Sequence, residues 1–222
     1  MAYVATRRTW LRIAAGVGLA ITALVASIFI LPRQYPTRQT ARRSFTLDDD
    51  FNLVRKILVR TGGTKQIMTM AGDSEFLDQQ WDTVGGGLDS FNPLNLDWKL
   101  DLNGKLKVRS RDDYVGRPVV TLTQVVRINR EEVHSTVDLD ERSERLWDYE
   151  MVTHFARGDT ERQTRVDLEL TQEILTTAPW FAHFIADRRV QASADRALAN
   201  QERAIRQLIA DNRDKRWLLL LP

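Results

Sequence analysis

Apolar and polar side chains alternate along most of residues 96–174, and this pattern constrains the fold more than any other feature of the chain. The first run places Trp98 and Leu100 on one face and Asp97 and Lys99 on the other. Because successive side chains of a β-strand point to opposite faces, a period of two predicts a strand with one buried face. Similar runs recur up to the end of this region. The sequence therefore predicts six antiparallel strands in series that form a curved sheet.

The first two of these strands are expected to form a hairpin at Asn103-Gly104, because Asn-Gly is the strongest two-residue turn signal. After the last strand, Pro179 opens a segment whose apolar residues recur at helical spacing. We expect a short turn over residues 179–187, followed by a long helix whose end overhangs the sheet. The apolar stripe of this segment consists of Trp180, Phe181, Phe184, Ile185, Val190, Ala194, Leu198, Ile205, Leu208 and Ile209.

Shorter elements are predicted before the sheet. Residues 43–47 alternate as a short strand, and the aspartates 48–50 can cap the helix that follows, which ends at Gly62-Gly63. Residues 64–70 fit a helix or a strand. Asp73 or Ser74 can cap a further short helix that carries Phe76, Leu77, Gln80 and Trp81.

This order of elements, over residues 41–212, resembles the helix-grip fold of the START-like superfamily (SRPBCC, polyketide cyclase/lipid-transport proteins). The resemblance also rests on Phe45-Thr46-Leu47-Asp48, which leads directly into a helix, and on the last strand, which runs through residues 176–180 into the final helix. It implies an α+β fold in which the sheet wraps around the C-terminal helix and leaves a cavity for apolar ligands. Folds of this kind include binders, cyclases and interaction modules, so the resemblance does not choose among these functions.

An uncharged run precedes this domain. Residues 13–31 contain no Asp, Glu, Lys or Arg, and as a helix of about 28 Å they match the hydrocarbon thickness of a bilayer. We predict a basic leader at residues 1–12, a transmembrane anchor at 13–31 and a tether at 32–40. The alternative is a cleaved signal peptide.

The charges beside this run bear on its orientation. Arg7, Arg8 and Arg12 favour a cytoplasmic leader and an extracytoplasmic domain, whereas Arg33 and Arg38, beyond the run, act in the opposite direction. We expect a single-pass membrane protein with an extracytoplasmic domain. The tail, residues 213–222, joins a basic cluster to Trp217 and four leucines, and either folds back onto the domain or contacts the bilayer.

Composition excludes several classes of function. Three of the 32 basic residues lie in the leader, so the rest of the chain has 29 basic and 30 acidic residues and a formal charge of −1. Such a balance gives no reason to expect nucleic acid as a partner. The absence of cysteine excludes disulfides, thiolate metal sites and a cysteine nucleophile.

Six inward-facing residues are our candidates for contact with a ligand, and the polar ones, Gln124 and Tyr149, could orient a head group or simply be satisfied wall residues. The six are Trp98, Gln124, Trp147, Tyr149, Met151 and Phe155. No acidic residue, lysine or histidine falls on the inward faces, so the alternation supplies no general acid or base. His134 and His154 lie on outward faces, and we expect no metal or cofactor.

Three hypotheses follow. The first is a membrane-anchored domain that binds an apolar or amphipathic small molecule, such as a lipid, between the sheet and the C-terminal helix. The second is a ligand-free scaffold in a membrane assembly, with a filled interior. The third is a cyclase-type enzyme, which would need an ionisable group inside the cavity. A cavity of about 300 Å³ or more would favour the first hypothesis over the second.

Overall fold

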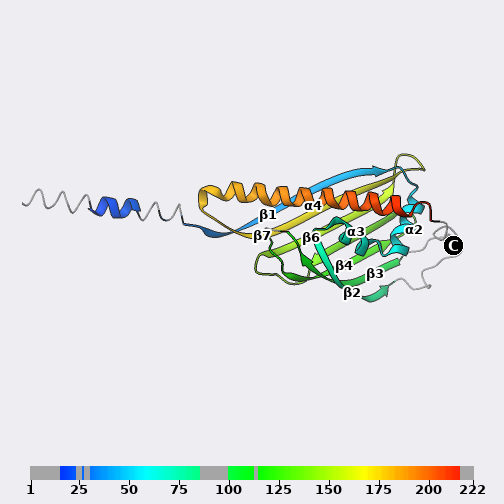
Figure 1. The fold of residues 1–222 in the computed structure, drawn as a ribbon, viewed down its shortest axis with the longest axis horizontal. Helices are drawn as coiled ribbons and strands as arrows, with labels where there is room; N and C mark the ends of the chain where they lie inside the picture. Colours follow the sequence, from blue (N-terminus) through cyan, green and yellow to red (C-terminus); the bar gives the residue numbers. More distant parts are fainter. Residues whose placement is uncertain (1–15, 24–26, 28–30, 86–99, 113–114, 216–222) are drawn as a thin grey trace, which may run out of the picture.

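The computed structural model describes residues 16–23, 27, 31–85, 100–112 and 115–215 (Figure 1). In this part of the chain, seven antiparallel strands form one sheet in the order β1-β7-β6-β5-β4-β3-β2. A long C-terminal helix, α4 (His183–Asn212), packs on β1 and β7, as the α+β prediction requires. The strands are β1 (Arg33–Leu47), β2 (Ser74–Gly85), β3 (Leu100–Ser110), β4 (Val119–Ile128), β5 (Glu132–Leu139), β6 (Leu146–Arg157) and β7 (Thr164–Ala178).

Two helices connect β1 to β2. The first, α2 (Phe51–Thr61), begins where the carboxylate of Asp50 accepts hydrogen bonds from the backbone N–H groups of Asn52 and Leu53. It ends at Gly62, whose left-handed φ of 64° suits a residue without a side chain. The second, α3 (Gly63–Ala71), resolves the ambiguity of residues 64–70 in favour of a helix. The predicted cap and the predicted stop of the first helix are confirmed.

The edge strands differ from the prediction. Residues 33–40, predicted to form a tether, belong to β1, which pairs with β7 from Arg33↔Ala178 to Leu47↔Thr164. The helix predicted to follow Ser74 is wrong, because this segment is β2. Register shifts at Phe76/Asp78 and Trp81/Thr83 interrupt its alternation. Each shift adds a residue and displaces the period of two, which gives the segment a helix-like spacing.

The predicted hairpin at Asn103-Gly104 is also wrong. Both residues lie inside β3, where Gly104 pairs with Trp81 of β2 and with Gln124 of β4. A Cβ at Gly104 would lie 2.7 Å from Cε3 of Trp81 and 2.7 Å from the carbonyl oxygen of Gln80. The glycine therefore allows the neighbouring strand and its tryptophan to approach the backbone closely. Such a close approach is one of the reasons for a glycine inside a strand.

Contacts at both ends of α4 fix it on the sheet. Its large apolar residues from Val190 to Ile209 are buried, and near its C-terminal end the guanidinium of Arg206 donates to the carbonyl oxygen of Thr46 at 3.0 Å. A short turn before it is present as the 3₁₀ turn η2 (Trp180–Ala182), but it is shorter than the predicted 179–187, because α4 already begins at His183. The C-terminal end of the helix was predicted to overhang the sheet, and this prediction is wrong. Leu208, near that end, is fully buried, whereas Trp180 and Phe184, near the N-terminal end, are exposed.

Part of the N-terminal prediction lies outside the described residues. Residues 16–23 are helical, but the leader 1–12, most of the rest of the predicted anchor 13–31, and residues 216–222 of the tail are not described. Among the described helices, none has the length and apolar character that crossing a bilayer would require.

Candidate functional site

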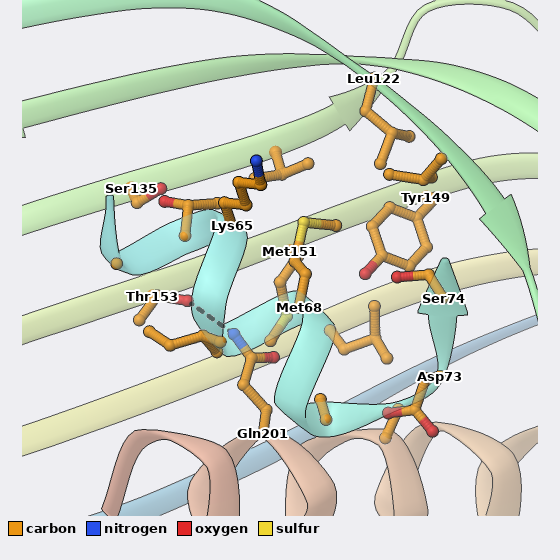
Figure 2. A pocket seen from close by; sticks show the side chains of 18 of the residues that line it. Lys65, Met68, Asp73, Ser74, Leu122, Ser135, Tyr149, Met151, Thr153 and Gln201 are labelled. Atoms are coloured by element: carbon orange, nitrogen blue, oxygen red, sulfur yellow. Dashed lines mark hydrogen bonds between the residues drawn. The ribbon is translucent and has the colours of Figure 1, made fainter. Parts of the chain in front are cut away.

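A cavity of about 450 Å³ lies between the sheet, α3 and α4 (Figure 2). Its apolar wall comes from the inward-facing side chains of the central strands, together with Met68 of α3 and Ala197 of α4. Alternation along each strand brings these side chains to the same face. The strand residues that form this wall are Leu102, Val108, Val120, Leu122, Val126, Ile128, Val133, Val137, Leu146, Tyr149, Met151, Phe155 and Leu170.

Three of the six predicted ligand contacts line this cavity: Tyr149, Met151 and Phe155. Trp147 does not, and its predicted inward orientation is wrong. A register shift between Leu146 and Asp148 makes Trp147 the extra residue of a bulge, so that Leu146 lines the cavity in its place. Arg142 lies instead over the indole ring of Trp147, with its Cζ 5.4 Å from the ring centroid. Trp98 lies outside the described residues.

The sixth predicted contact, Gln124, is fully buried behind the cavity wall and bonded to protein. Its Nε2 donates to Oγ1 of Thr64 at 2.7 Å and to Oγ of Ser135 at 3.3 Å. Its Oε1 accepts from Nε2 of Gln79 at 3.4 Å. Because a buried amide requires partners, this set of contacts explains Gln124 as a satisfied wall residue, one of the two alternatives given by the sequence.

A polar group forms one end of the cavity. Figure 2 shows the hydroxyl of Tyr149 pointing toward Ser74, with the carboxylate of Asp73 beyond it. Within the described residues, this hydroxyl makes no hydrogen bond. Burial and, to a smaller extent, the charge of Asp73 raise the pKa of Tyr149 to about 12, so the phenol is neutral at pH 7. It is therefore available to donate to, or accept from, a molecule in the cavity.

The two carboxylates at this end come from the loops that precede β2 and follow β3. Asp73 accepts a hydrogen bond from Nδ2 of Asn200 at 2.9 Å, and Asp112 accepts one from the hydroxyl of Ser193. Burial raises the pKa of Asp73, and the charge of Asp112 raises it further, against the hydrogen bond from Asn200. A carboxyl group of this kind takes up a proton more readily than an exposed one.

The prediction that the cavity contains no ionisable group is wrong. Lys65, Asp73 and Asp112 all line the cavity, although no charged residue was predicted there. That prediction considered only strand faces, whereas Lys65 lies on α3 and the two aspartates lie beyond strand ends. Periodicity cannot place such residues. The sequence pattern assigns Asp73 only as a possible helix cap. Its position at the junction of two elements is the one sequence feature that could have indicated a polar group in the cavity.

The two outward-facing histidines, His134 and His154, lie close together on neighbouring strands. The ring centroids of His134 and His154 are 6.0 Å apart, and Nε2 of His154 lies 2.8 Å from a carboxylate oxygen of Glu132. Burial lowers the pKa of His134, and the charge of His154 lowers it further. Among the residues that the structure describes, no group of three or more His, Cys, Asp or Glu side chains is arranged to hold a metal ion.

The arrangement of the elements is the helix grip expected from the resemblance. Two short helices follow β1, a long C-terminal helix packs on the sheet, and the strand order is β1-β7-β6-β5-β4-β3-β2. The fold is START-like. Solved structures also match the chain in fold. No protein-family model matches the sequence, and no curated protein matches it.

Three of the matching structures illustrate the likeness. The Zhui aromatase/cyclase from Streptomyces sp. R1128 is 14% identical, with a TM-score of 0.49, over 81% of this chain and 98% of that chain. A START superfamily protein from Mycobacterium smegmatis is 9% identical, with a TM-score of 0.46, over 78% and 97%. A norcoclaurine synthase point mutant from Thalictrum flavum, in complex with a transition-state analogue, is 11% identical, with a TM-score of 0.46, over 82% and 100%. The likeness concerns the fold and not the ligand.

Proposed function

We propose that the chain is a membrane-anchored domain that binds an apolar or amphipathic small molecule in the cavity between the sheet and α4. The observation that carries the proposal is the cavity itself, whose volume of about 450 Å³ falls in the range of small-molecule sites. A filled interior, as the scaffold hypothesis requires, would have left no such space. The uncharged run at residues 13–31 supports the membrane anchor.

The lining also suggests the shape of the ligand. An apolar body would fit against the strand wall and Met68, and a polar end would meet the hydroxyl of Tyr149 and the carboxylate of Asp73. An alcohol at that end could donate to Asp73 and accept from Tyr149, whereas a protonated amine could donate to both. A hydroxyl that lines the cavity and has no partner among the described residues is the kind of group that a bound molecule would satisfy.

Native mass spectrometry of the full chain, purified in a mild detergent, tests this proposal. We expect a co-purified small molecule and, after its removal, binding of the apolar fluorophore N-phenyl-1-naphthylamine. Ala197→Trp fills the cavity and should abolish both signals, whereas Ala210→Trp, on the exposed face of the same helix, should abolish neither. Equal binding by the two variants would show that the fluorophore binds outside the cavity and would contradict the proposal.

The polar end can be tested separately. Tyr149→Phe removes only the hydroxyl, which has no bond to the described residues, so the thermal unfolding midpoint should change little. Retention of the co-purified molecule should nevertheless fall, whereas binding of N-phenyl-1-naphthylamine should not. Unchanged retention of the molecule would remove Tyr149 from the site.

The carboxylate favours one second candidate, a cyclase-type enzyme. Asp73 lines the cavity, and burial raises its pKa, which brings a carboxyl group closer to the working range of a general acid or base. Incubation of the co-purified molecule with the wild-type chain and with Asp73→Asn separates the two functions. A product whose mass appears only with the wild-type chain would favour an enzyme, and a molecule returned unchanged by both would favour a binder.

A further inference from the structure

Four large apolar side chains project into solvent where β7 passes into α4. The exposed fractions of Trp180, Phe181, Phe184 and Ile185 are 62%, 56%, 56% and 40%, and we call these four residues the end patch. The sequence placed all four on the buried stripe of the helix. In the structure, the stripe that packs on the sheet begins only with Ala186 and Val190. Exposed groups of three aromatic residues and an isoleucine are characteristic of binding surfaces.

The end patch lies where the chain enters the domain. Arg33, the first residue of β1, pairs with Ala178, two residues before Trp180, so the predicted anchor ends beside the patch (Figure 1). Two contacts fix this junction. The ring of Tyr35 stacks on His183, with centroids 3.8 Å apart and planes 4° apart, and its hydroxyl donates to Asp187 at 3.3 Å. The strand that follows residues 13–31 is thus held against the turn of α4 that carries the patch.

Two of the segments outside the described residues, 86–99 and 216–222, are too far from this surface to cover it. Residues 216–222 follow the far end of α4, a helix of 30 residues, or about 45 Å at 1.5 Å per residue. Seven residues extend at most about 25 Å. Residues 86–99 connect Gly85 to Leu100. Both of these residues lie at the sheet end that contains Leu47, which is the end remote from the patch, so the connection must start and finish there. Their reach is also about 25 Å, shorter than β3 itself, at about 36 Å.

The side chains around the patch suit a membrane surface. Trp and Phe are amphipathic or apolar rings that favour the bilayer interface. Three exposed arginines lie near them: Arg33 on β1, and Arg188 and Arg189 on α4. The guanidinium carbon of Arg188 lies 5.8 Å from the ring centroid of Phe184. Apolar rings beside basic groups complement the acyl and anionic head-group layers of a bilayer.

We propose that the end patch inserts into the interface of the bilayer that holds residues 13–31, so that the domain stands on the membrane with α4 beginning at its surface. This inference rests on the membrane anchoring in the proposed function, and it adds a second membrane contact that fixes the orientation of the domain.

Site-directed spin labelling of the full chain tests the insertion. The natural chain has no cysteine, so single substitutions Phe181→Cys and Phe184→Cys carry a nitroxide without background. Gln207→Cys, on an exposed position near the other end of α4, is the matched control. The chains are reconstituted in vesicles of phosphatidylcholine and phosphatidylserine. We expect the labels at 181 and 184 to be severalfold more accessible to oxygen, relative to a water-soluble nickel complex, than the label at 207.

Three results would overturn the inference, and each points to a different cause. Equal, water-like accessibility at all three positions in chains that float with the vesicles would remove the end patch from the bilayer and leave the anchor intact. Dipolar broadening at position 181 that disappears on dilution with unlabelled chain would assign the patch to a second copy. Chains that fail to float would refute the anchoring itself. Binding of N-phenyl-1-naphthylamine, measured on the same samples, reports separately on the cavity.

Discussion

The side-chain amide of Gln124 on β4 donates to the hydroxyl of Thr64 on α3 across 2.7 Å. This contact connects the middle of the sheet to the helix that covers the cavity, and Gln124 itself is fully buried. Since Ser135 and Gln79 complete the bonding of the amide, the polarity of this wall is already used within the protein. Tyr149 differs from this amide, because its hydroxyl lines the cavity and has no hydrogen-bond partner among the described residues.

Removal of the Thr64 hydroxyl should destabilise the domain. In Thr64→Val, Nε2 of Gln124 keeps only the longer bond to Ser135, and a poorly satisfied buried amide costs about 1–3 kcal/mol. Thr69→Val, on the exposed face of the same helix, removes a bond to the carbonyl oxygen of Lys65 and should cost about 0.5 kcal/mol or less. Chemical denaturation measures both. Equal losses would mean that the contact between Gln124 and Thr64 does not contribute to stability.

The bulge in β6 predicts unequal roles for two aromatic residues. Phe155→Ala should cost about 3–5 kcal/mol, because this side chain is 3% exposed and packs in the core. Trp147→Ala should cost about 1.5 kcal/mol at most, since the indole lies outside the cavity beneath Arg142. Comparable free-energy losses for the two variants would place Trp147 inside after all and would contradict the register of β6.

The strand assignment of residues 103 and 104 can be tested in the same way. Gly104→Ala should cost about 1–3 kcal/mol, because the new Cβ would lie 2.7 Å from the backbone of Gln80. Asn103→Ala is exposed and should cost about 0.5 kcal/mol or less. If residues 103 and 104 formed a hairpin turn, both substitutions would lower the free energy of unfolding, because the turn depends on both residues. A large loss for Asn103→Ala would therefore refute the strand.

These comparisons show where sequence patterns were sufficient. Unbroken alternation placed Tyr149, Met151 and Phe155 on the cavity wall, and carboxylates before an apolar stripe placed the cap within residues 48–50, where the structure has it at Asp50. The errors arose at bulges, because one extra residue reverses the face of every residue beyond it, as at Trp147. The pairing that turns Gly104 into a strand residue is equally invisible locally, since it depends on Trp81, 23 positions earlier in the chain.

The anchor is tested by extraction. If residues 13–31 form an uncleaved span, alkaline carbonate should leave the full-length chain in the membrane pellet, because the apolar run remains in the hydrocarbon core when peripheral contacts are broken. Asp substitutions at Ala20 and Val25, in the middle of the run, should release the chain into the supernatant. A soluble product that begins near Ile28 would instead indicate a cleaved signal peptide.

Asp73 should make the stability of the domain depend on pH in a direction opposite to that of a salt-bridged carboxylate. Burial raises its pKa, so the folded state holds the proton more tightly than the unfolded state, whose pKa is near 3.8. Ionisation therefore opposes folding, and the penalty is fully present above the raised pKa and disappears as pH falls toward the unfolded value. Asp73→Asn keeps an oxygen that can accept from Asn200 and removes the charge.

The variant Asp73→Asn should accordingly unfold at a higher temperature than the wild-type chain at pH 7, and the difference should shrink as pH is lowered toward 4. Asp211→Asn, an exposed substitution on α4, controls for the loss of one negative charge and should show no comparable trend. Thermal unfolding followed by circular dichroism at several pH values measures the differences. If Asp73→Asn is less stable than the wild-type chain at pH 7, the carboxylate is instead stabilised by its neighbours, and its assignment as a group with spare capacity for a ligand fails with it.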